Sequence, residues 1–279
     1  MQTLAFDGRT GAAGDMLLGA LLAAGADASA LDAVEESLPV SFETERVTRN
    51  GIRATSARVV HDDADESDDG DPPGHEHGHD GAHDHSHDHD HGDHDHSHHG
   101  DAEGHGHTRT YAEVIELVES MALPEAVEAD ALEAFRILGE AEASVHGMEL
   151  DDTAFHEVGA DDAIADVVGC MLLLDDLRER GVERVVTTPL HAGGGEVTFS
   201  HGTYPVPSPA VVEIAERADW SLRGGPIETE LLTPTGAAIL AAVAEGVDHL
   251  PELRVEESGY GAGAKEFAQH PNVVRAMIG

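Results

Sequence analysis

A stretch of 47 residues divides this chain and cannot itself join a folded core. Residues 61–107 contain 15 of the 21 histidines and 16 acidic residues, but neither lysine nor arginine. In its first part, residues 61–74, apolar side chains are few and charge is high, so burial cannot offset the entropy of ordering it. We therefore expect one globular domain built from residues 1–60 and 108–279, interrupted by a disordered His/Asp-rich loop at 61–107.

The second part of this loop, residues 75–107, alternates histidine with aspartate, serine or glycine and has no apolar period. Such tracts bind metals because neutral imidazole is a good ligand for nickel, zinc and copper. We expect metal capture by histidines such as His85, His87, His89 and His91. The tract does not discriminate between nickel, zinc, cobalt and copper, and a solvated linker without a metal function is the alternative.

Charge and composition exclude several classes of protein. The formal net charge is −41, and the residues outside the loop still carry −25, with 40 acidic against 15 basic side chains. This acidity is typical of a salt-adapted (halophilic) cytoplasmic protein, and it repels nucleic acids and anionic membranes. No apolar run reaches the roughly 18 residues of a transmembrane helix. A single cysteine, Cys170, excludes a disulfide framework and any CxxC site.

The rest of the chain mixes strand and helix patterns, which predicts an α+β (mixed α/β) fold. A hairpin is indicated by two β-rich runs, 42–49 and 52–60, around Asn50-Gly51, a pair favoured in type I′ turns. Further strands are predicted at 3–7, 155–158, 182–187, 228–232, 252–257 and 272–278, and helices at 15–24, 31–38, 110–121, 124–146, 161–180, 211–217 and 237–244. Residues 189–209 are expected to be irregular.

The segment FDGRTGAAGDM places glycines between a predicted strand and a predicted helix. Backbone N–H groups at such a helix start can hold an anion, which makes Gly11 and Gly14 candidate ligand-binding residues. Asp7 and Asp15 would lie close together, and two carboxylates suit a hard cation or acid–base work. The alternative is that Asp15 caps its helix and the glycines only form a tight turn.

The segment FHEVGADDAIADVVG holds the densest cluster of titratable groups outside the loop. His156 and Glu157 would point to opposite faces of a strand, whereas Asp162 and Asp166 share one face of the following helix. His156, Asp162 and Asp166 could bind a divalent metal, or a carboxylate could orient the imidazole as a base. The alternative is an ordinary histidine beside a helix capped by Asp161 or Asp162.

Three other segments could contact a ligand. In PLHAGGGEVTFSHGTYPVPSPA, Gly194 could let a phosphate approach and His201 could bind metal or donate a proton, unless this is a plain surface loop. In ELLTPTGAAIL, Thr233 and Thr235 lie at the positive end of a helix, although a simple hydroxyl N-cap explains much of that pattern. In SGYGAGAKEF, Gly261 belongs to a Gly-rich turn that could hold a phosphate, and Lys265 is the only lysine of the chain. Lys265 either binds a specific anion or has no particular function.

Taken together, these segments resemble the LarC-type nickel insertion proteins of the lactate-racemase cofactor pathway. The matching stretches occur in the family order and span nearly the whole chain outside the loop: DGRTGAAGDMLLGALL, AEASVHG, FHEVGADDAIADVVG, SHGTYPVPSPA, ELLTPTGAAIL and GYGAGAKEF through PNVVRAMIG. A His-rich loop before the helical middle is also a habit of that family.

The resemblance implies insertion of Ni(II) into a dithiolated pyridinium mononucleotide, in a reaction that uses CTP with a divalent cation and yields the nickel pincer cofactor of lactate racemase. Longer members continue into a C-terminal domain associated with the nucleotide, so we expect this chain to be the N-terminal half, with a separate polypeptide as partner. The family's cysteines are replaced around Asp7–Thr10 and Phe199-Ser200, so thiolates cannot be nickel donors there.

In the resulting hypothesis, residues 75–107 bind nickel and deliver it, and the folded part of the chain carries out the insertion reaction. Nickel would pass to a site of His156, Glu157, Asp162 and Asp166, with His201, whose oxygen and imidazole ligands release it to the softer sulfurs of the substrate. His156, or a carboxylate beside it, would take the ring proton. The rival hypothesis is a non-catalytic nickel chaperone or storage protein. We also expect a homo-oligomer.

Overall fold

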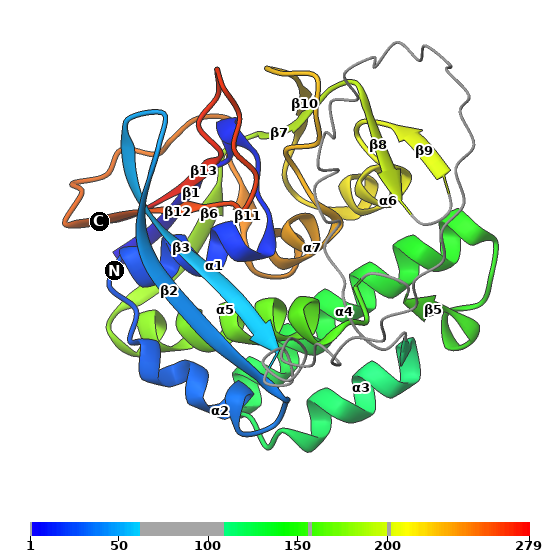
Figure 1. Ribbon diagram of the computed structural model, residues 1–279. Helices are drawn as coiled ribbons and strands as arrows, with labels where there is room; N and C mark the ends of the chain where they lie inside the picture. Colours follow the sequence, from blue (N-terminus) through cyan, green and yellow to red (C-terminus); the bar gives the residue numbers. More distant parts are fainter. Residues whose placement is uncertain (1, 62–108, 156–157, 200–201) are drawn as a thin grey trace, which may run out of the picture.

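The computed structural model describes residues 2–61, 109–155, 158–199 and 202–279 (Figure 1). Its centre is a seven-stranded mixed sheet with the strand order β11-β6-β1-β13-β12-β3-β2. Both parts of the chain supply strands to this sheet, which confirms a single mixed α/β domain. The strands are β1 (Gln2–Asp7), β2 (Val40–Arg49), β3 (Ile52–His61), β6 (Val182–Thr187), β11 (Glu245–Gly246), β12 (Glu257–Ala262) and β13 (Val273–Ile278).

The strand directions bring several chain segments to one edge of this sheet. Strand β1 is parallel to β6, and both β1 and β12 are antiparallel to β13, so β1, β6 and β12 end on the same side. We call this side the carboxyl edge. Ligands of open α/β sheets bind beyond such strand ends.

Three two-stranded pairs accompany the main sheet. They are β4 (Arg109–Thr110) with β5 (Ala154–Phe155), β7 (Leu190–Gly193) with β10 (Leu222–Gly224), and β8 (Glu196–Phe199) with β9 (Gly202–Pro205). The stretch 189–209, predicted to be irregular, therefore contains three short strands. Their shortness explains the error, because four residues interrupted by glycines carry no recognisable alternation.

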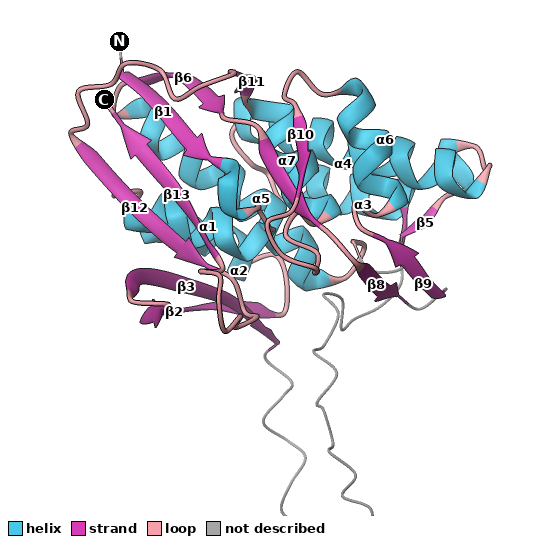
Figure 2. Ribbon diagram, turned by 90° about the horizontal axis from the view of Figure 1, so that it is seen from above, coloured by secondary structure: helices cyan, strands magenta, loops and turns pink. Residues whose placement is uncertain are grey.

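The helices gather on one side of the sheet (Figure 2). They are α1 (Gly14–Ala23), α2 (Asp32–Glu35), α3 (Tyr111–Ser120), α4 (Glu125–His146), α5 (Asp161–Glu179), α6 (Pro209–Arg217) and α7 (Pro234–Val243), with short 3-10 turns η1 (Gly8–Thr10), η2 (Ala28–Leu31) and η4 (Leu150–Asp152). None of these described helices is long and apolar enough to cross a membrane.

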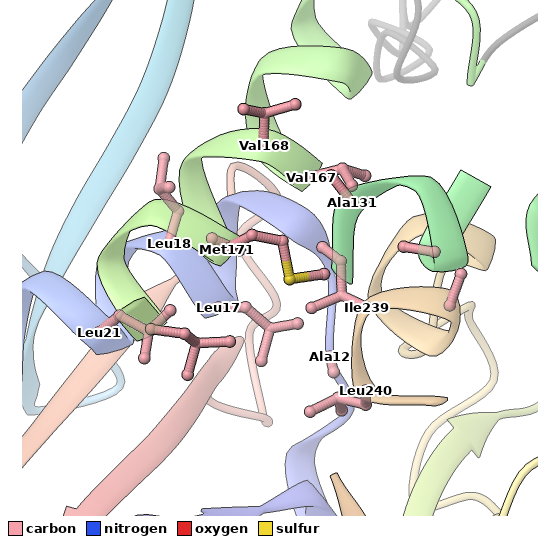
Figure 3. Close-up of a cluster of buried hydrophobic side chains, with 14 of the residues drawn as sticks. Ala12, Leu17, Leu18, Leu21, Ala131, Val167, Val168, Met171, Ile239 and Leu240 are labelled. Carbon is pink, nitrogen blue, oxygen red and sulfur yellow. The ribbon is translucent and has the colours of Figure 1, made fainter. Parts of the chain in front are cut away.

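Helix α1 lies at the centre of the hydrophobic core. Apart from Asp15 in the first turn, its sequence is apolar around the whole helix, as expected for a helix covered on all sides. Figure 3 shows side chains of α1 packed against those of α5 and α7; the labelled residues are Ala12, Leu17, Leu18, Leu21, Ala131, Val167, Val168, Met171, Ile239 and Leu240. A side chain at Gly261 would collide with the Met16 carbonyl, so this glycine lets α1 approach β12.

Several boundaries confirm the sequence analysis. Asn50 and Gly51 both have positive φ, 47° and 82°, as a type I′ hairpin turn requires. Helices α1, α4 and α5 and strands β1, β6 and β13 lie within one or two residues of their predicted ranges. Cys170 is fully buried in the core, as expected from its apolar surroundings.

Three other predictions are wrong. No strand forms at 228–232. Glu230 forms an isolated β-bridge with Gly193, and Leu232 forms another with Ala12, so the segment pairs with two different neighbours and with neither over several residues. Strand β12 begins at Glu257, where the prediction of a strand at 252–257 ends.

The third error concerns the start of α5. Its N-cap is Ala160, without a side-chain hydrogen bond, so neither Asp161 nor Asp162 caps the helix. Both aspartates lie inside the first turn instead, and Asp161 forms an ion pair with Arg109 at 2.6 Å.

Candidate functional site

The sequence segments with candidate chemistry converge on the start of α1. Strand β1 ends at Asp7 on the carboxyl edge, and the chain passes through η1 into α1. Ala12 accepts a hydrogen bond from the Thr233 N–H (3.1 Å) and donates one to the Leu231 carbonyl (2.9 Å). Residues 6–16 and 230–240, far apart in the sequence, are therefore joined directly by the backbone.

The glycines of the first segment permit close approach of other parts of the chain. Gly11 has φ 87°, and a side chain there would collide with the Leu231 carbonyl. A side chain at Gly14 would collide with the Asp166 carboxylate. The Gly11 N–H is already used, because it donates to the Gly8 carbonyl at 3.1 Å. Packing explains these two glycines, and their predicted role in binding an anion remains a prediction.

Asp7 lies between two guanidinium groups. It accepts bonds from Arg9 Nε (2.8 Å) and Nη2 (2.6 Å) and from Arg275 Nη2 (2.6 Å). Burial by itself raises the pKa of Asp7, but the bonds and charge of Arg9 and the bond from Arg275 outweigh it and hold the pKa below its ordinary value. This carboxylate is thus already neutralised by the protein.

Asp15 has a different environment eight residues later. Within the part of the chain that the structure describes, its oxygens accept hydrogen bonds only from backbone N–H groups, those of Met16 (2.7 Å) and Ala264 (3.0 Å). Burial raises the pKa of Asp15 to about 6, against the opposing effects of these two bonds and of the Lys265 charge. A carboxyl group of this kind changes its protonation state near neutral pH, which suits a general acid or base.

Asp166 lies close to Asp15 on the neighbouring helix. Its carboxylate packs on Gly14, and Cys170, one turn further along α5, donates a weak hydrogen bond to the Gly14 carbonyl at 3.8 Å. Burial, followed by the charges of Asp166 and Asp15, raises the pKa of the Cys170 thiol well above its ordinary value. We call Asp15 and Asp166 the carboxylate pair. The thiol beside it is neutral, so this cluster offers oxygen ligands and no thiolate.

The start of α7 adjoins the carboxylate pair. Thr233 is the N-cap and its hydroxyl accepts a hydrogen bond from the Gly236 N–H at 3.2 Å, which confirms the capping interpretation. A side chain at Gly236 would collide with the Ala12 carbonyl, so the N-terminal ends of α1 and α7 lie side by side. Thr235 is buried. Two positive helix ends at one place favour an anionic ligand.

The remaining predicted residues are placed only in part. Asp162 lies on the same face of α5 as Asp166, four residues away, and accepts a bond from the Ala163 N–H at 2.9 Å. The Gly194 N–H donates to the Thr229 carbonyl at 3.2 Å. Lys265 is exposed, and its charge acts on Asp15. Outside the described residues lie His156, Glu157, His201, His85, His87, His89 and His91.

The chain re-enters the described structure beside one of the candidate segments. Strand β4 pairs with β5, and Arg109 donates to the Gly159 carbonyl at 2.9 Å. Together with the ion pair to Asp161, these contacts fix Arg109, two residues after the His/Asp-rich loop, next to Phe155, Gly159 and Asp161. This attachment was not predictable from the sequence, because β4 has only two residues.

Two histidines at the carboxyl edge extend the candidate set. His191 lies in β7, in the same segment as the predicted site residues Gly194 and His201. His270 lies in the loop between β12 and β13. His270 is only 9% exposed. A lone histidine in a polar loop gives no signal in the sequence. Within the described residues, no group of three or more His, Cys, Asp or Glu side chains has the arrangement of a metal site.

Comparison with known proteins adds the following. The model of a family described as "Nickel insertion protein" matches residues 4–279. Proteins named "Putative nickel insertion protein" from Methanosarcina mazei, Methanococcoides burtonii and Archaeoglobus fulgidus are 38%, 37% and 36% identical over the whole chain. The chain spans 59% of the length of each of these relatives. No solved structure shows significant similarity.

Proposed function

The chain belongs to the nickel insertion protein family, and from this premise we propose that it inserts Ni(II) into a dithiolated pyridinium mononucleotide, in a CTP-dependent reaction, to form the nickel pincer cofactor of lactate racemase. The chain spans 59% of its relatives' length, and we propose that the C-terminal part of these relatives acts as its partner in the reaction and would bind CTP with a divalent cation. Nickel is a substrate in this proposal, and the enzyme is a nickel-inserting lyase.

The observation that carries this proposal is the convergence of the candidate segments on the start of α1. There the carboxylate pair adjoins two helix N-termini, and Asp162 lies one turn from Asp166. Carboxylate oxygens hold nickel less firmly than thiolates do, so the two sulfurs of the substrate could withdraw the ion. The neutral thiol of Cys170 would not compete for it. His156, Glu157 and His201 remain proposed members of the site.

The chemical step needs a base. Nickel forms two bonds to sulfur and one to a ring carbon, and that carbon loses a proton to the protein while the ring keeps the electron pair for the metal–carbon bond. His156 is one candidate, and Asp15 is a second because its pKa of about 6 allows it to accept a proton at neutral pH. The reaction as written consumes no oxidant.

The phosphate of the mononucleotide would lie against positive groups at the same edge. The ends of α1 and α7 provide helix dipoles, and Arg9 provides a guanidinium that is 68% exposed although it pairs with Asp7. Lys265 is exposed near Asp15. These residues support recognition of an anion by a chain whose overall charge would repel it.

The test is nickel insertion by the chain together with its C-terminal partner, with NiCl2, CTP, magnesium and the dithiolated mononucleotide, followed through activation of lactate racemase. We expect Asp166→Asn to lower the rate about 100-fold, because it removes a charged ligand but keeps the shape. Asp175→Asn on the same helix is the matched control and should act like the wild type. Equal rates for both variants would refute the site.

The non-catalytic alternative makes a different prediction. A chaperone or storage protein would bind nickel, but with all components present the cofactor would form at the same rate when the chain is replaced by free nickel. Deletion of residues 75–107 separates the feeding role from the chemical one. We expect insertion by the deleted protein to be slow at low nickel and normal at saturating nickel.

A further inference from the structure

Two histidines on the carboxyl edge are held on either side of η1. On one side, the Gly8 N–H donates to the Thr188 hydroxyl at 3.0 Å, and β7, which contains His191, follows two residues later. On the other side, the Thr10 hydroxyl donates to the Val273 carbonyl, three residues after His270. Short connections therefore hold the backbone segments that carry both histidines against the same turn.

Each of these imidazoles has a nitrogen that the protein leaves unsatisfied. Nδ1 of His191 and Nε2 of His270 are buried and have no hydrogen-bond partner among the described residues. An unsatisfied buried polar group costs about 1–3 kcal/mol, so native proteins rarely leave two of them at neighbouring positions. A bound ligand that accepts a nitrogen lone pair from each ring would remove this cost.

The electrostatic surroundings favour neutral rings. Burial and then the proximity of His191 lower the pKa of His270, against a hydrogen bond to the Thr10 backbone that raises it. Arg223, the strand partner of His191 in β10, adds a positive charge on the exposed side. Neutral imidazole is the form that binds metal, and nitrogen ligands suit borderline ions such as nickel, copper and zinc.

We propose that His191 and His270 together bind one borderline divalent metal ion, at a site separate from the carboxylate pair. Two imidazole ligands leave further coordination positions open, so an ion there can be taken over by incoming sulfur ligands without first losing a full protein shell. The binding site follows from the two histidines alone. Its use as the last position of nickel before insertion rests on the proposed function.

Peptide-resolved oxidation of the full chain tests the site. Copper(II), in excess over all the histidines, oxidises the imidazoles that bind it when ascorbate is added, and mass spectrometry locates the products. We expect oxidation of His191 and His270 to exceed that of the exposed His249 at least fivefold. Because copper binds imidazole more tightly than nickel does, NiCl2 is added in large excess over copper, and it should reduce this oxidation to the His249 level. Oxidation equal to that of His249 in the wild type, with or without nickel, would overturn the proposal.

A variant shows whether the two rings share one ion. In His270→Asn, oxidation of His191 should fall to the His249 level, while His249→Gln should leave both signals unchanged. Persistent, nickel-protected oxidation of His191 in His270→Asn would exclude a shared ion. If His270→Asn does not fold, which circular dichroism detects, crystals of the wild type soaked in NiCl2 decide instead. They should give an anomalous peak about 2.1 Å from one nitrogen of each ring, and a water molecule there would overturn the proposal.

The insertion assay separates this inference from the proposed function. If nickel binds at the histidine pair but His191→Asn inserts nickel at the wild-type rate, the transfer role is wrong and the site stands. If no metal binds there while Asp166→Asn still loses activity, the inference is wrong and the proposed function stands.

Discussion

Asp7 and Asp15 lie at the two ends of the same turn, yet their surroundings shift their pKa values in opposite directions. Asp7 is bound by two arginines that lower its pKa. Asp15 accepts hydrogen bonds from two backbone N–H groups, and burial raises its pKa to about 6. The first carboxylate fastens the end of β1 to β13, since its partner Arg275 lies on that strand. Among the described residues, the carboxyl group of Asp15 has no such ion pair with an arginine, and its raised pKa lets it gain or lose a proton near neutral pH. In so acidic a chain, the partners of a carboxylate therefore reveal more about its role than its presence in a motif.

The largest effect should come from Asp15→Asn in the nickel insertion assay. We expect a rate about 10²–10⁴-fold lower, the range for loss of a general base. The wild-type rate should rise with pH through about 6, as Asp15 loses its proton, and the variant should lack this rise. Asp7→Asn, measured at a temperature where it remains folded, is the control and should keep the pH profile. An unchanged profile in Asp15→Asn would assign the base elsewhere.

Removal of the arginines should have the next largest effect, on stability. Arg275→Met leaves the buried Asp7 with one exposed partner, so we expect the free energy of unfolding to fall by about 2–3 kcal/mol. Arg9→Met should cost less than about 1 kcal/mol, because its side chain is 68% exposed. Urea unfolding at pH 7 measures both. Equal losses would show that the two arginines hold Asp7 equally.

The two aspartates should also give opposite pH dependences of stability. The pKa of Asp15 lies above its ordinary value of 3.8, so folding takes up a proton and stability falls as pH rises from about 4 to 6. Asp15→Asn should therefore gain up to about 3 kcal/mol over the wild type at pH 8 and almost nothing at pH 4.

For Asp7, whose pKa is lowered, the stabilisation is present above 3.8 and disappears as pH falls through the folded value. Asp7→Asn should thus be destabilised at pH 7, and the difference from the wild type should shrink at pH 3. Denaturant unfolding of both variants at several pH values measures these slopes. Parallel slopes would contradict the contrast between the two ends of the turn.

The smallest effect should come from Cys170→Ala. The thiol is buried, and its raised pKa keeps it neutral, so it supplies no nickel ligand. We expect nickel insertion within twofold of the wild type and no change in nickel stoichiometry. A tenfold loss of insertion with unchanged stability would make the thiol part of the site.

Long periodic elements were predictable from the sequence, and the meeting of distant segments was not. The apolar run of α1 and the Asn50-Gly51 turn depend on neighbours in the chain, so local patterns suffice. The prediction of a strand at 228–232 was wrong because the two β-bridges of this segment go to residues about 40 and 220 positions away. The same applies to the site. The sequence predicts both Asp15 and Asp166 as site residues, but only the fold shows that they lie close together, because Gly14 has no side chain that would displace Asp166.

His270 illustrates what sequence reasoning cannot supply. A histidine surrounded by polar residues looks like any surface residue, and its burial depends on η1, which comes from the other end of the chain. Asp7 shows the reverse case, since its position in a motif suggested a metal ligand before Arg275, 268 residues away, was known to bind it.

The pairing of β4 with β5 has a consequence for how an ion travels. Arg109 is fixed beside Phe155, Gly159 and Asp161, so every histidine of residues 75–107 is connected to that place by at most 34 peptide bonds. A metal ion bound in this segment would be present there at the effective concentration of a tethered group, which reaches millimolar values for short linkers. Its transfer would follow first-order kinetics, with a half-time that does not change when the protein is diluted.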